Sequence, residues 1–404
     1  MSELEVRAIC DGEKEALLEV LCAAFPDDPA ATWRRVIDGL WGDFEHTRVG
    51  VVDGRVVSTV QIFQYPMRID AKVFVTGAIA HVATKPGAGG SYAGRVLADA
   101  MHVMEREGFS LSVLVTNIPR YYNRHGWWLV PERGFRIDFG EATFGETKGV
   151  TVERFDRTRH LDAAAQLHHE ASVRLNGTTP REREAWLTSP PWEPDDEARW
   201  LVALRAGKVA GYVRGRAASL HIVSELAAAD EGAALALLGR LADAAREGGE
   251  AHLRGKFPLD SSVARALREK GCRVEEEFPC GPDEDFEITM MRFMDLGKFF
   301  RQMEEVLSKR AAHARYGGSA KLAILSDSGA VAIAVTNGKV TTSPQPQSGA
   351  EELKVKDAAL VELVLGTRTP AELGVGRDLS PAAREMLDAI FPKRDFVLWL
   401  PDHF

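Results

Sequence analysis

GAIAHVATKPGAGGSYAGRVLADAMHVMEREGFSLSVLVTNIPRYYNRHGW, residues 77–127, is the stretch that decides the fold of this 404-residue chain. It begins with a nearly continuous apolar run, residues 78–83, which is typical of a strand buried on both faces. A proline and a glycine-rich turn end that run. Apolar residues then recur at helical spacing over 96–104, with Gly108 as the expected C-cap, and a second apolar run follows at 111–115. The stretch therefore predicts a strand, a turn, a helix and a strand in succession.

The turn between the first strand and the helix carries three glycines, Gly87, Gly89 and Gly90. Backbone N–H groups in such a turn are unshielded by side chains, and the following helix directs its positive N-terminus at the same place. A diphosphate would be stabilised there. A glycine-rich turn alone is a weak signal, because many such turns bind nothing. The tyrosines that follow the second strand add a second feature, a candidate acid.

The overall composition limits the partners. Fifty basic and fifty-nine acidic residues give a net charge of -9, and no run of lysine or arginine occurs. This balance argues against nucleic acid and anionic membrane as partners and suits a cationic substrate. The four cysteines lack metal-ligand spacing, so we expect no metal site and no disulfide framework. Nowhere do eighteen apolar residues run together, and residues 1–20 lack a signal-like apolar core, so we expect a cytoplasmic protein.

An internal repeat divides the chain. Residues 4–25 have the same hydrophobic pattern as residues 150–171, and in each the pattern predicts a short strand followed by an amphipathic helix. Residues 46–63, with a turn at Asp53-Gly54, likewise match residues 199–216. We therefore expect two copies of one α/β unit, with bounds of 1–149 and 150–294.

The two copies differ at the turn before the helix. The second copy carries Asp230 and Glu231 there, where the first copy offers bare amides. Acidic residues suit a helix N-terminus but would repel a pyrophosphate. We expect one cofactor site per chain, in the first copy.

A third region, residues 295–404, has a different pattern. It opens with an amphipathic helix, continues with strands at 322–325 and 331–335, and closes with helices at 357–365 and 380–391. This region resembles the sterol-carrier-like fold, a sheet covered by helices.

Two short motifs in the first copy resemble those of the GNAT N-acyltransferases. They are Val-Ala-Thr-Lys-Pro at 82–86 and Tyr-Asn-Arg-His-Gly-Trp at 122–127. The resemblance implies acetyl-CoA as acyl donor and a tyrosine, Tyr122, near its thioester sulfur. It implies cofactor contacts from the strand and the loop, with Asn117 as either a further cofactor contact or a helix cap. The strand and loop positions are Val82, Ala83, Thr84, Gly87, Gly89, Gly90, Ser91, Tyr92 and Ala93.

This chain departs from the GNAT pattern in one respect. After the proline the family usually has Arg-Gly-x-Gly, whereas this loop is shorter and lacks the arginine. A lost charge-assisted contact typically forfeits about 1.5 to 3 kcal/mol of binding. Lys85 and Arg95 are the cations that would compensate in part, against the favoured interpretation of each as an ordinary surface charge.

The order of the three regions resembles the enhanced intracellular survival (Eis) family. That resemblance covers the whole chain and implies an α/β (α+β) fold of tandem GNAT-like domains followed by a sterol-carrier-like domain. It further implies that Tyr122 acts as general acid and that the C-terminal carboxylate of Phe404 acts as general base. Members of the family acetylate amines, including aminoglycosides, and assemble as homo-hexamers. A small-molecule amine acceptor and a homo-oligomer are the expectations that follow.

The chemistry leaves alternatives open for several residues. The apolar tail FVLWLPDHF either packs on its own domain or serves catalysis. His81 is a second candidate base, with a sheet histidine as the competing interpretation. Asp27, Asp28 and Asp402 are candidates for holding the cationic acceptor, each against a reading as solvated surface charge.

The sequence leaves two candidate functions. The first is an acetyl-CoA-dependent N-acetyltransferase acting on a primary amine of a small cationic acceptor. The alternative is a non-catalytic protein derived from this fold that binds CoA thioesters or lipid.

Overall fold

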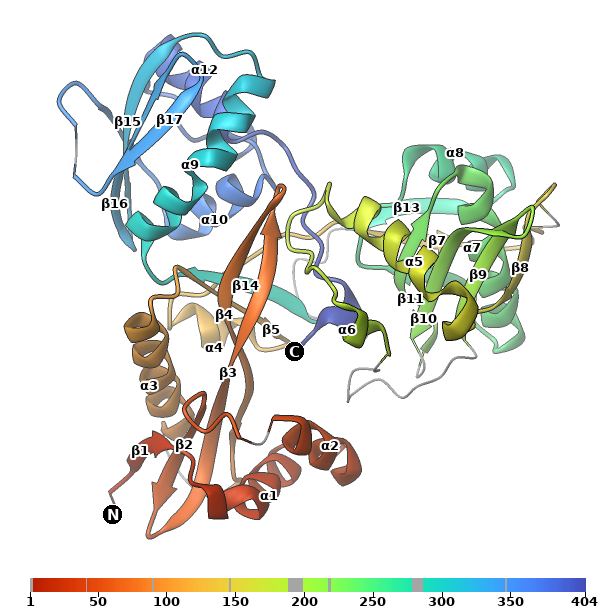
Figure 1. The fold of residues 1–404 in the computed structure, drawn as a ribbon, viewed down its shortest axis with the longest axis horizontal. Coiled ribbons are helices and arrows are strands. Elements are labelled where there is room, and N and C mark those ends of the chain that lie inside the picture. Colours follow the sequence, from red (N-terminus) through yellow and green to blue (C-terminus); the bar gives the residue numbers. More distant parts are fainter. Residues whose placement is uncertain are drawn as a thin grey trace.

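The computed structural model describes residues 3–40, 42–88, 91–144, 147–187, 199–216, 219–277, 286–345 and 347–404. Three sheets with their covering helices build the molecule, and we call them the first, second and third units (Figure 1). In Figure 1 the first unit forms the lower part, the third unit the top, and the second unit lies to one side. The predicted α/β class is confirmed.

The first unit is a seven-stranded sheet in the order β1-β2-β3-β4-β5-β14-β6. Its strands are β1 (Glu5–Ala8), β2 (Thr47–Val52), β3 (Arg55–Ile69), β4 (Lys72–Thr84), β5 (Leu111–Thr116), β14 (Ile288–Phe293) and β6 (Trp128–Leu129). Its helices are the short 3-10 turn η1 (Asp11–Glu13), α1 (Lys14–Ala24), α2 (Ala30–Leu40), α3 (Tyr92–Glu107) and α4 (Pro119–Asn123). The predicted strand, turn, helix and strand are thus β4, the 85–91 loop, α3 and β5, and Gly108 ends α3 in the left-handed conformation with φ of 77°.

The second unit is also a seven-stranded sheet, in the order β13-β7-β12-β11-β10-β9-β8. Its strands are β7 (Gly134–Asp138), β8 (Thr151–Arg154), β9 (Trp200–Arg205), β10 (Lys208–Arg216), β11 (Ser219–Ala228), β12 (His252–Gly255) and β13 (Arg273–Glu277). Its helices are α5 (Arg157–Ser172), α6 (Arg183–Leu187), α7 (Glu231–Glu247) and α8 (Ser261–Glu269).

The two sheets repeat one topology, with one strand exchanged. In each sheet five strands follow in chain order, and only the fourth and fifth of these pair in parallel, β4 with β5 and β11 with β12. The sixth place is taken by a strand from the other part of the sequence. β14 inserts between β5 and β6, while β7 inserts between β12 and β13. Sheet membership therefore does not follow the bounds 1–149 and 150–294 at these two strands, and the exchange ties the two units together.

The third unit is a four-stranded sheet in the order β17-β16-β15-β18. Its strands are β15 (Ser319–Ser326), β16 (Gly329–Thr336), β17 (Lys339–Ser343) and β18 (Glu351–Lys354). Its helices are α9 (Leu296–His313), α10 (Asp357–Leu365), α11 (Pro370–Leu373) and α12 (Pro381–Ile390), and a 3-10 turn, η3 (Leu400–Asp402), lies near the end of the chain.

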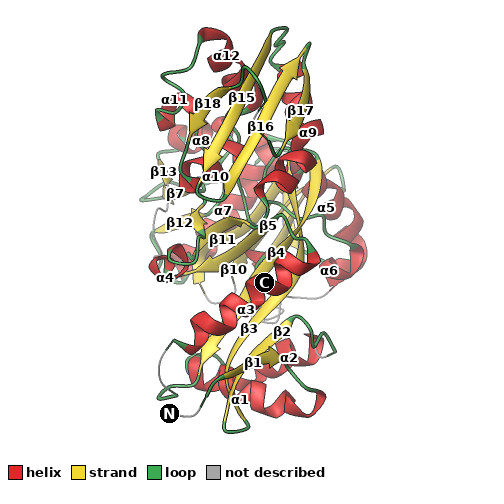
Figure 2. Cartoon of the chain, turned by 90° about the vertical axis from the view of Figure 1, so that its left-hand side faces the viewer, coloured by secondary structure: helices red, strands yellow, loops and turns green. Residues whose placement is uncertain are grey.

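A shared core joins the first and third units. The long β3–β4 hairpin rises from the first unit toward the third, as Figure 2 shows. Buried side chains near its tip, among them Met67 and Phe74, belong to the same apolar cluster as Phe299 and Phe300 of α9. Burying each such side chain contributes about 1.5 to 3 kcal/mol, so the hairpin fixes the third unit on the first.

Candidate active site

Strand β4 carries an irregularity where the sequence predicts cofactor contacts. In its pairing with β3, Thr59 lies opposite Ala83 but Gln61 lies opposite Ala80, so β4 holds one extra residue between them. His81 lies in this bulge with φ of 51°, a left-handed conformation that is uncommon outside glycine. A bulge of this kind bends the strand and leaves backbone groups without ladder partners.

Beyond the bulge β4 and β5 separate. The two strands pair in parallel only from Gly77 to Ile79 on β4 and from Ser112 to Leu114 on β5. β4 nevertheless continues to Thr84 and β5 to Thr116. The facing edges of both strands are thereby opened at their carboxyl ends, which is where open α/β sheets bind ligands. Val82 and Thr84 are half-buried along this opening, and Ala83 between them is buried.

Helix α3 begins directly beyond this opening, with an N-terminus that no side chain caps. Ser91 occupies the N-cap position without a side-chain hydrogen bond, and the first turn contains no acidic residue. Gly87 turns the preceding loop with φ of 78°, and Tyr92 and Ala93 are half-buried in the first turn. Gly89 and Gly90, two of the predicted loop contacts, lie outside the described residues. The amides of this turn are therefore available to an anion.

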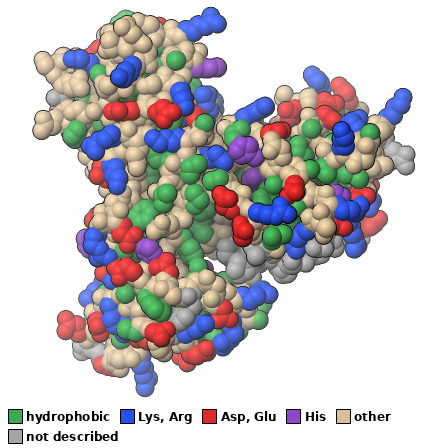
Figure 3. Space-filling view, viewed as in Figure 1, with side chains coloured by type: hydrophobic (Ala, Val, Ile, Leu, Met, Phe, Trp, Pro, Cys, Tyr) green, Lys and Arg blue, Asp and Glu red, His purple; other side chains and the backbone are tan. Residues whose placement is uncertain are grey.

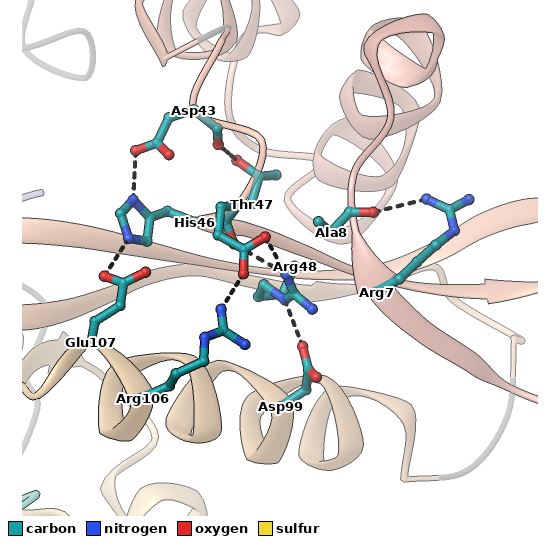
Figure 4. Close-up of polar contacts among 10 residues, drawn as sticks. Arg7, Ala8, Asp43, His46, Thr47, Arg48, Asp99, Arg106 and Glu107 are labelled. Atoms are coloured by element: carbon teal, nitrogen blue, oxygen red, sulfur yellow. Dashed lines mark hydrogen bonds and ion pairs between the residues drawn. The ribbon is translucent and has the colours of Figure 1, made fainter.

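The remainder of α3 is fixed by polar contacts to β2 and the segment before it (Figure 4). The Nε2 atom of His46 lies 2.8 Å from Glu107, and its Nδ1 atom lies 2.9 Å from Asp43. Arg48 donates from Nε to Asp99 at 2.6 Å. Burial lowers the pKa of His46, but the hydrogen bonds to the two carboxylates outweigh this and raise it. These contacts hold the middle and the C-terminal end of α3 and leave its N-terminus to the opening.

The equivalent helix of the second unit is built differently. Asp230 is the N-cap of α7 and accepts a hydrogen bond from the N–H of Ala233 at 2.9 Å. Arg205 pairs with the same carboxylate at 3.0 Å. The hydrogen bonds and the arginine lower the pKa of Asp230, so it stays ionised. The N-terminus of α7 already holds an anion, and that of α3 does not.

The two tyrosines lie together in α4. Tyr122 is 7% exposed and packs among Tyr121 and Trp127, with ring centroids 5.0 and 6.4 Å away. Burial, then the neighbouring Tyr121 and Glu287, raise the pKa of Tyr122, which keeps its phenol protonated at neutral pH. The hydroxyl of Tyr121 is buried without a hydrogen-bond partner in the described part of the chain, and it lies beside Gly94 of α3.

Phe404 reaches the first sheet from the far end of the sequence. Its ring lies 4.9 Å from that of Tyr65 and 6.3 Å from that of Phe63, both on β3. Phe63 in turn lies 5.7 Å from the ring of His81 in the bulge. The chain therefore places Phe404 on the same strand pair as the predicted cofactor contacts (Figure 1). In Figure 3 apolar side chains gather on this middle part of the molecule, between the first and second units.

Two further predicted site residues, His81 and Asn117, differ in their burial. Burial lowers the pKa of His81 to about 4, and its Nδ1 atom lies 3.0 Å from Gln61, so it is a weak base. Asn117 is exposed and does not cap α4, whose N-cap position belongs to Ile118 without a side-chain hydrogen bond. The cap interpretation of Asn117 is therefore wrong.

The three acids predicted to hold the acceptor differ in their exposure to solvent. Asp27 and Asp28 are exposed in the loop between α1 and α2. Asp402 is instead buried and paired with Arg181 at 2.5 Å. Glu287, which precedes β14 and has no motif in the sequence, contributes to the raised pKa of Tyr122. Burial raises the pKa of Glu287 itself, although the cations Lys256 and Arg216 act against this. Only the strand exchange brings Glu287 to this site, so sequence spacing gave no signal for it.

Among the described residues, no three His, Cys, Asp or Glu side chains are grouped so as to hold a metal ion, and none of the helices has the length and apolar character of a membrane span.

Residues 5–130 match the family model of the acetyltransferase (GNAT) domain. The matched range holds every strand and helix of the first unit except β14, and together with the bulged β4, the opening toward β5 and the uncapped α3 it supports acetyltransferase chemistry in that unit. A search of curated proteins returns no match.

Three solved structures resemble the chain over nearly its whole length. A probable N-acyltransferase from Enterococcus faecalis V583 is 16% identical, with a TM-score of 0.72 over 98% of this chain and 100% of that one. A GCN5-related N-acetyltransferase from Kribbella flavida is 20% identical, with a TM-score of 0.68 over 100% and 99%. Eis1 from Mycobacterium abscessus is 17% identical, with a TM-score of 0.66 over 99% and 100%. These likenesses establish a shared fold.

Proposed function

We propose that this chain is an Eis-like N-acetyltransferase that takes its acetyl group from acetyl-CoA and transfers it to a primary amine of a small cationic acceptor. The observation that carries the proposal is the contrast between α3 and α7. One helix N-terminus is bare and lies at the opening between β4 and β5, while its counterpart is closed by Asp230. An uncapped helix N-terminus at that place suits a pyrophosphate.

The residues around the opening fit acetyl-CoA in two parts. The amides of Ser91, Tyr92 and Ala93 would hold the pyrophosphate at the first turn of α3. The free edge of β4 from Val82 to Thr84 would pair with the amide groups of the pantetheine arm, as an added strand pairs with a sheet edge. Acetyl-CoA would supply the activated acetyl group as a thioester.

Tyr122 would hold a proton beside the departing sulfur. Because burial raises its pKa well above that of a thiol, about 8.5 in a free cysteine, full transfer of the proton to a thiolate is unfavourable. A hydrogen bond donated by the phenol to the developing negative charge is the stabilisation that this pKa supports.

The carboxylate of Phe404 would accept the proton from the acceptor amine. The aromatic rings of Phe63 and Tyr65 pack against the ring of Phe404 and hold this end of the chain beside β3. Basicity does not separate Phe404 from His81, because burial lowers the pKa of His81 to about 4 and an unperturbed terminal carboxylate has a pKa of about 3.3 to 3.7. The assignment to Phe404 rests on its place beside β3.

A cationic acceptor would meet negative charge on the side of Tyr122. Asp28 is exposed, and Glu287 is close enough to alter the pKa of Tyr122. Asp402, by contrast, already shares its charge with Arg181. We therefore propose the exposed Asp28, with Asp27 next to it, as the residues that favour an ammonium group. Burial raises the pKa of Glu287 and the cations Lys256 and Arg216 act on it, so it contributes less negative charge.

Several wider features belong to the same proposal and rest on the resemblance to the Eis family. They are the division into domains at 1–149, 150–294 and 295–404, the sterol-carrier-like nature of the third unit, a homo-oligomer of hexameric size and a cytoplasmic location.

The test is a thiol-release assay with acetyl-CoA and a panel of amines that includes spermidine and kanamycin. We expect free CoA thiol and a singly acetylated amine by mass spectrometry. Removing Phe404 or changing Tyr122→Phe should reduce kcat by roughly 10²-fold or more, the usual size of an acid–base contribution. Unchanged kcat in both variants would remove these residues from the mechanism.

A binding protein without catalysis is the second candidate, and one observation favours it. The two cations nearest the loop in the sequence are engaged elsewhere, since Lys85 pairs with Glu19 at 3.0 Å and Arg95 donates to the carbonyl of Leu4 at 3.1 Å. Neither replaces the arginine that the loop lacks. Calorimetry with acetyl-CoA separates the cases, because tight binding without thiol release would favour a sensor and absent binding with co-purified lipid would favour a carrier.

A further inference from the structure

The C-terminal segment threads between two hydrophobic cores. Phe396 and Leu398 are buried in the cluster shared by the first and third units, whereas Val397 and Trp399 are buried in the cluster of the second unit. This alternation is that of an extended chain with side chains on opposite faces. The segment therefore contacts all three units before it ends at Phe404.

Backbone contacts hold the upstream part of this segment. The N–H of Val397 donates to the carbonyl of Asn176 at 2.8 Å, and the N–H of Asn176 donates to that of Asp395 at 2.9 Å. Trp399 donates from its indole to Ser172 at 3.3 Å. These contacts end five residues before the end of the chain, so they do not fix its last turn.

A buried ion network holds that last turn. Arg181 lies before α6 and pairs from Nε with Asp402 of η3 at 2.5 Å. Its Nη1 atom pairs with Glu225 of β11 at 2.8 Å, and its guanidinium lies 5.0 Å from the ring of Trp186. Glu225 also lies 2.9 Å from the Nδ1 atom of His168. The side chains of Arg181 and Asp402 are each 6% exposed.

The charges in this network favour a positional role. Burial opposes the charge on Arg181, yet the carboxylates of Asp402 and Glu225 outweigh burial and raise its pKa further. Burial raises the pKa of Asp402 in spite of the neighbouring Arg181. Keeping this buried carboxylate ionised therefore costs free energy. One oxygen of Asp402 and one nitrogen of Arg181 also have no hydrogen-bond partner among the described residues. Buried ion pairs seldom add net stability, and apolar side chains would fill this space at lower cost.

We infer that Arg181 is a positioning residue that clamps Asp402 to the second unit and so fixes the carboxylate of Phe404, two residues further on, at the acetyl-transfer site. The inference rests on the proposed role of Phe404. The guanidinium fork joins two carboxylates from different parts of the fold, which a single ammonium cannot do with the same geometry. The second unit thereby takes part in catalysis without touching the substrate.

Asp402→Ala in the full-length chain is the sharpest variant. It releases the last turn while leaving Arg181 and Glu225 as a balanced pair within the second unit. Arg181→Leu is unsuitable, because it would leave two buried carboxylates uncompensated. Asp402→Asn keeps a hydrogen-bond acceptor for Arg181 and serves as the conservative variant. Asp138→Ala is the control. It removes a carboxylate whose distance to the Arg136 side chain is 2.8 Å, and this ion pair lies away from the C-terminal segment.

Two readouts separate this inference from the proposed function. The first is kcat and KM with acetyl-CoA and spermidine or kanamycin. We expect Asp402→Ala to lower kcat by roughly 10- to 100-fold, the cost of misplacing a catalytic group by about 1 Å, with KM for acetyl-CoA unchanged. Asp402→Asn should fall between that variant and the parent, and the control should match the parent. The second readout, the rate at which carboxypeptidase Y releases phenylalanine from the native chain, needs no activity. Release should rise about tenfold or more in Asp402→Ala, because loss of one charge-assisted hydrogen bond shifts an equilibrium by that factor.

The outcomes are distinct. Lower kcat with faster release supports the clamp. Parental kcat and parental release in Asp402→Ala overturn it, even where removal of Phe404 abolishes transfer. A fall in kcat with parental release also overturns it, because Asp402 would then act without holding the terminus. If the parent transfers no acetyl group, the proposed function fails, and the release rate alone decides whether Arg181 holds the terminus.

Discussion

The bare N-terminus of α3 makes a prediction in which stability and binding change in opposite directions. Ser91→Asp would place a carboxylate at the N-cap position of a 16-residue helix whose first turn holds no acid. A negative charge there stabilises a helix by about 0.3 to 1 kcal/mol. The same charge would repel a pyrophosphate. Two unit charges about 4 Å apart interact with about 4 kcal/mol at an effective dielectric constant near 20, and a displaced charge-assisted hydrogen bond costs about 1.5 to 3 kcal/mol.

These energies set the expected size of the effect. A loss of about 1.5 to 4 kcal/mol corresponds to a rise in KM for acetyl-CoA of roughly tenfold to several hundredfold. The melting temperature should rise by at most a few degrees. Steady-state thiol release gives the KM, calorimetry gives the dissociation constant, and thermal unfolding gives the stability.

Two further variants control this experiment. Ser91→Asn has nearly the same shape as the aspartate without its charge, so its KM should stay near the parental value. Asp230→Ala removes the cap of α7 and should cost about 0.5 to 2 kcal/mol of stability with no change in acetyl-CoA binding. An unchanged KM in Ser91→Asp would refute the assignment of the pyrophosphate to α3.

Three other predictions concern the tyrosines, the histidine behind α3 and the path of the C-terminal segment. Tyr122→Phe should lower kcat by roughly 10²-fold. Tyr121→Phe removes a hydroxyl that has no hydrogen-bond partner among the described residues, so kcat should stay near the parental value. The reverse result would assign the role of acid to Tyr121. Because the pKa of His46 is raised in the folded chain, its contribution to stability should be complete below its unfolded pKa, about 6.5, and should be lost as pH rises through the folded pKa. The free energy of unfolding of the parent and of His46→Gln, measured across that pH range, gives this contribution. Parallel plots of the two free energies against pH would contradict the prediction. Gly177 has φ of 88°, and an added Cβ would lie 2.6 Å from the ring of Phe396, so Gly177→Ala should destabilise the chain by more than about 1 kcal/mol, and a parental denaturation midpoint would count against this packing.

Local patterns predicted the elements around the site. The apolar run at 78–83, the helical spacing at 96–104 and Gly108 correspond to β4, α3 and the end of α3 in the structure. Asp53-Gly54 likewise forms the turn between β2 and β3 with positive φ at both residues. These features depend on residues close in the sequence, which is why the sequence alone reveals them.

Long-range arrangement was the part that the sequence could not predict. The exchange of β7 and β14 depends on which sheet edge each strand meets, and the apolar pattern of a strand does not encode its partner. The same exchange brings Glu287 near Tyr122. Asp402 was predicted to face a substrate, yet its carboxylate is taken by Arg181, 221 residues away in sequence. No spacing rule connects two residues that meet only through the packing of separate units.

The most direct test of the proposed mechanism moves the terminal carboxylate without removing the aromatic ring. Adding one glycine after Phe404 keeps the ring on Tyr65 and displaces the carboxylate by about 3.8 Å, one Cα spacing. Measured with acetyl-CoA and the best amine of the panel, kcat of this extended chain should fall by roughly 10²-fold while KM for acetyl-CoA stays parental. A parental kcat in the extended chain would contradict the role of the Phe404 carboxylate as base.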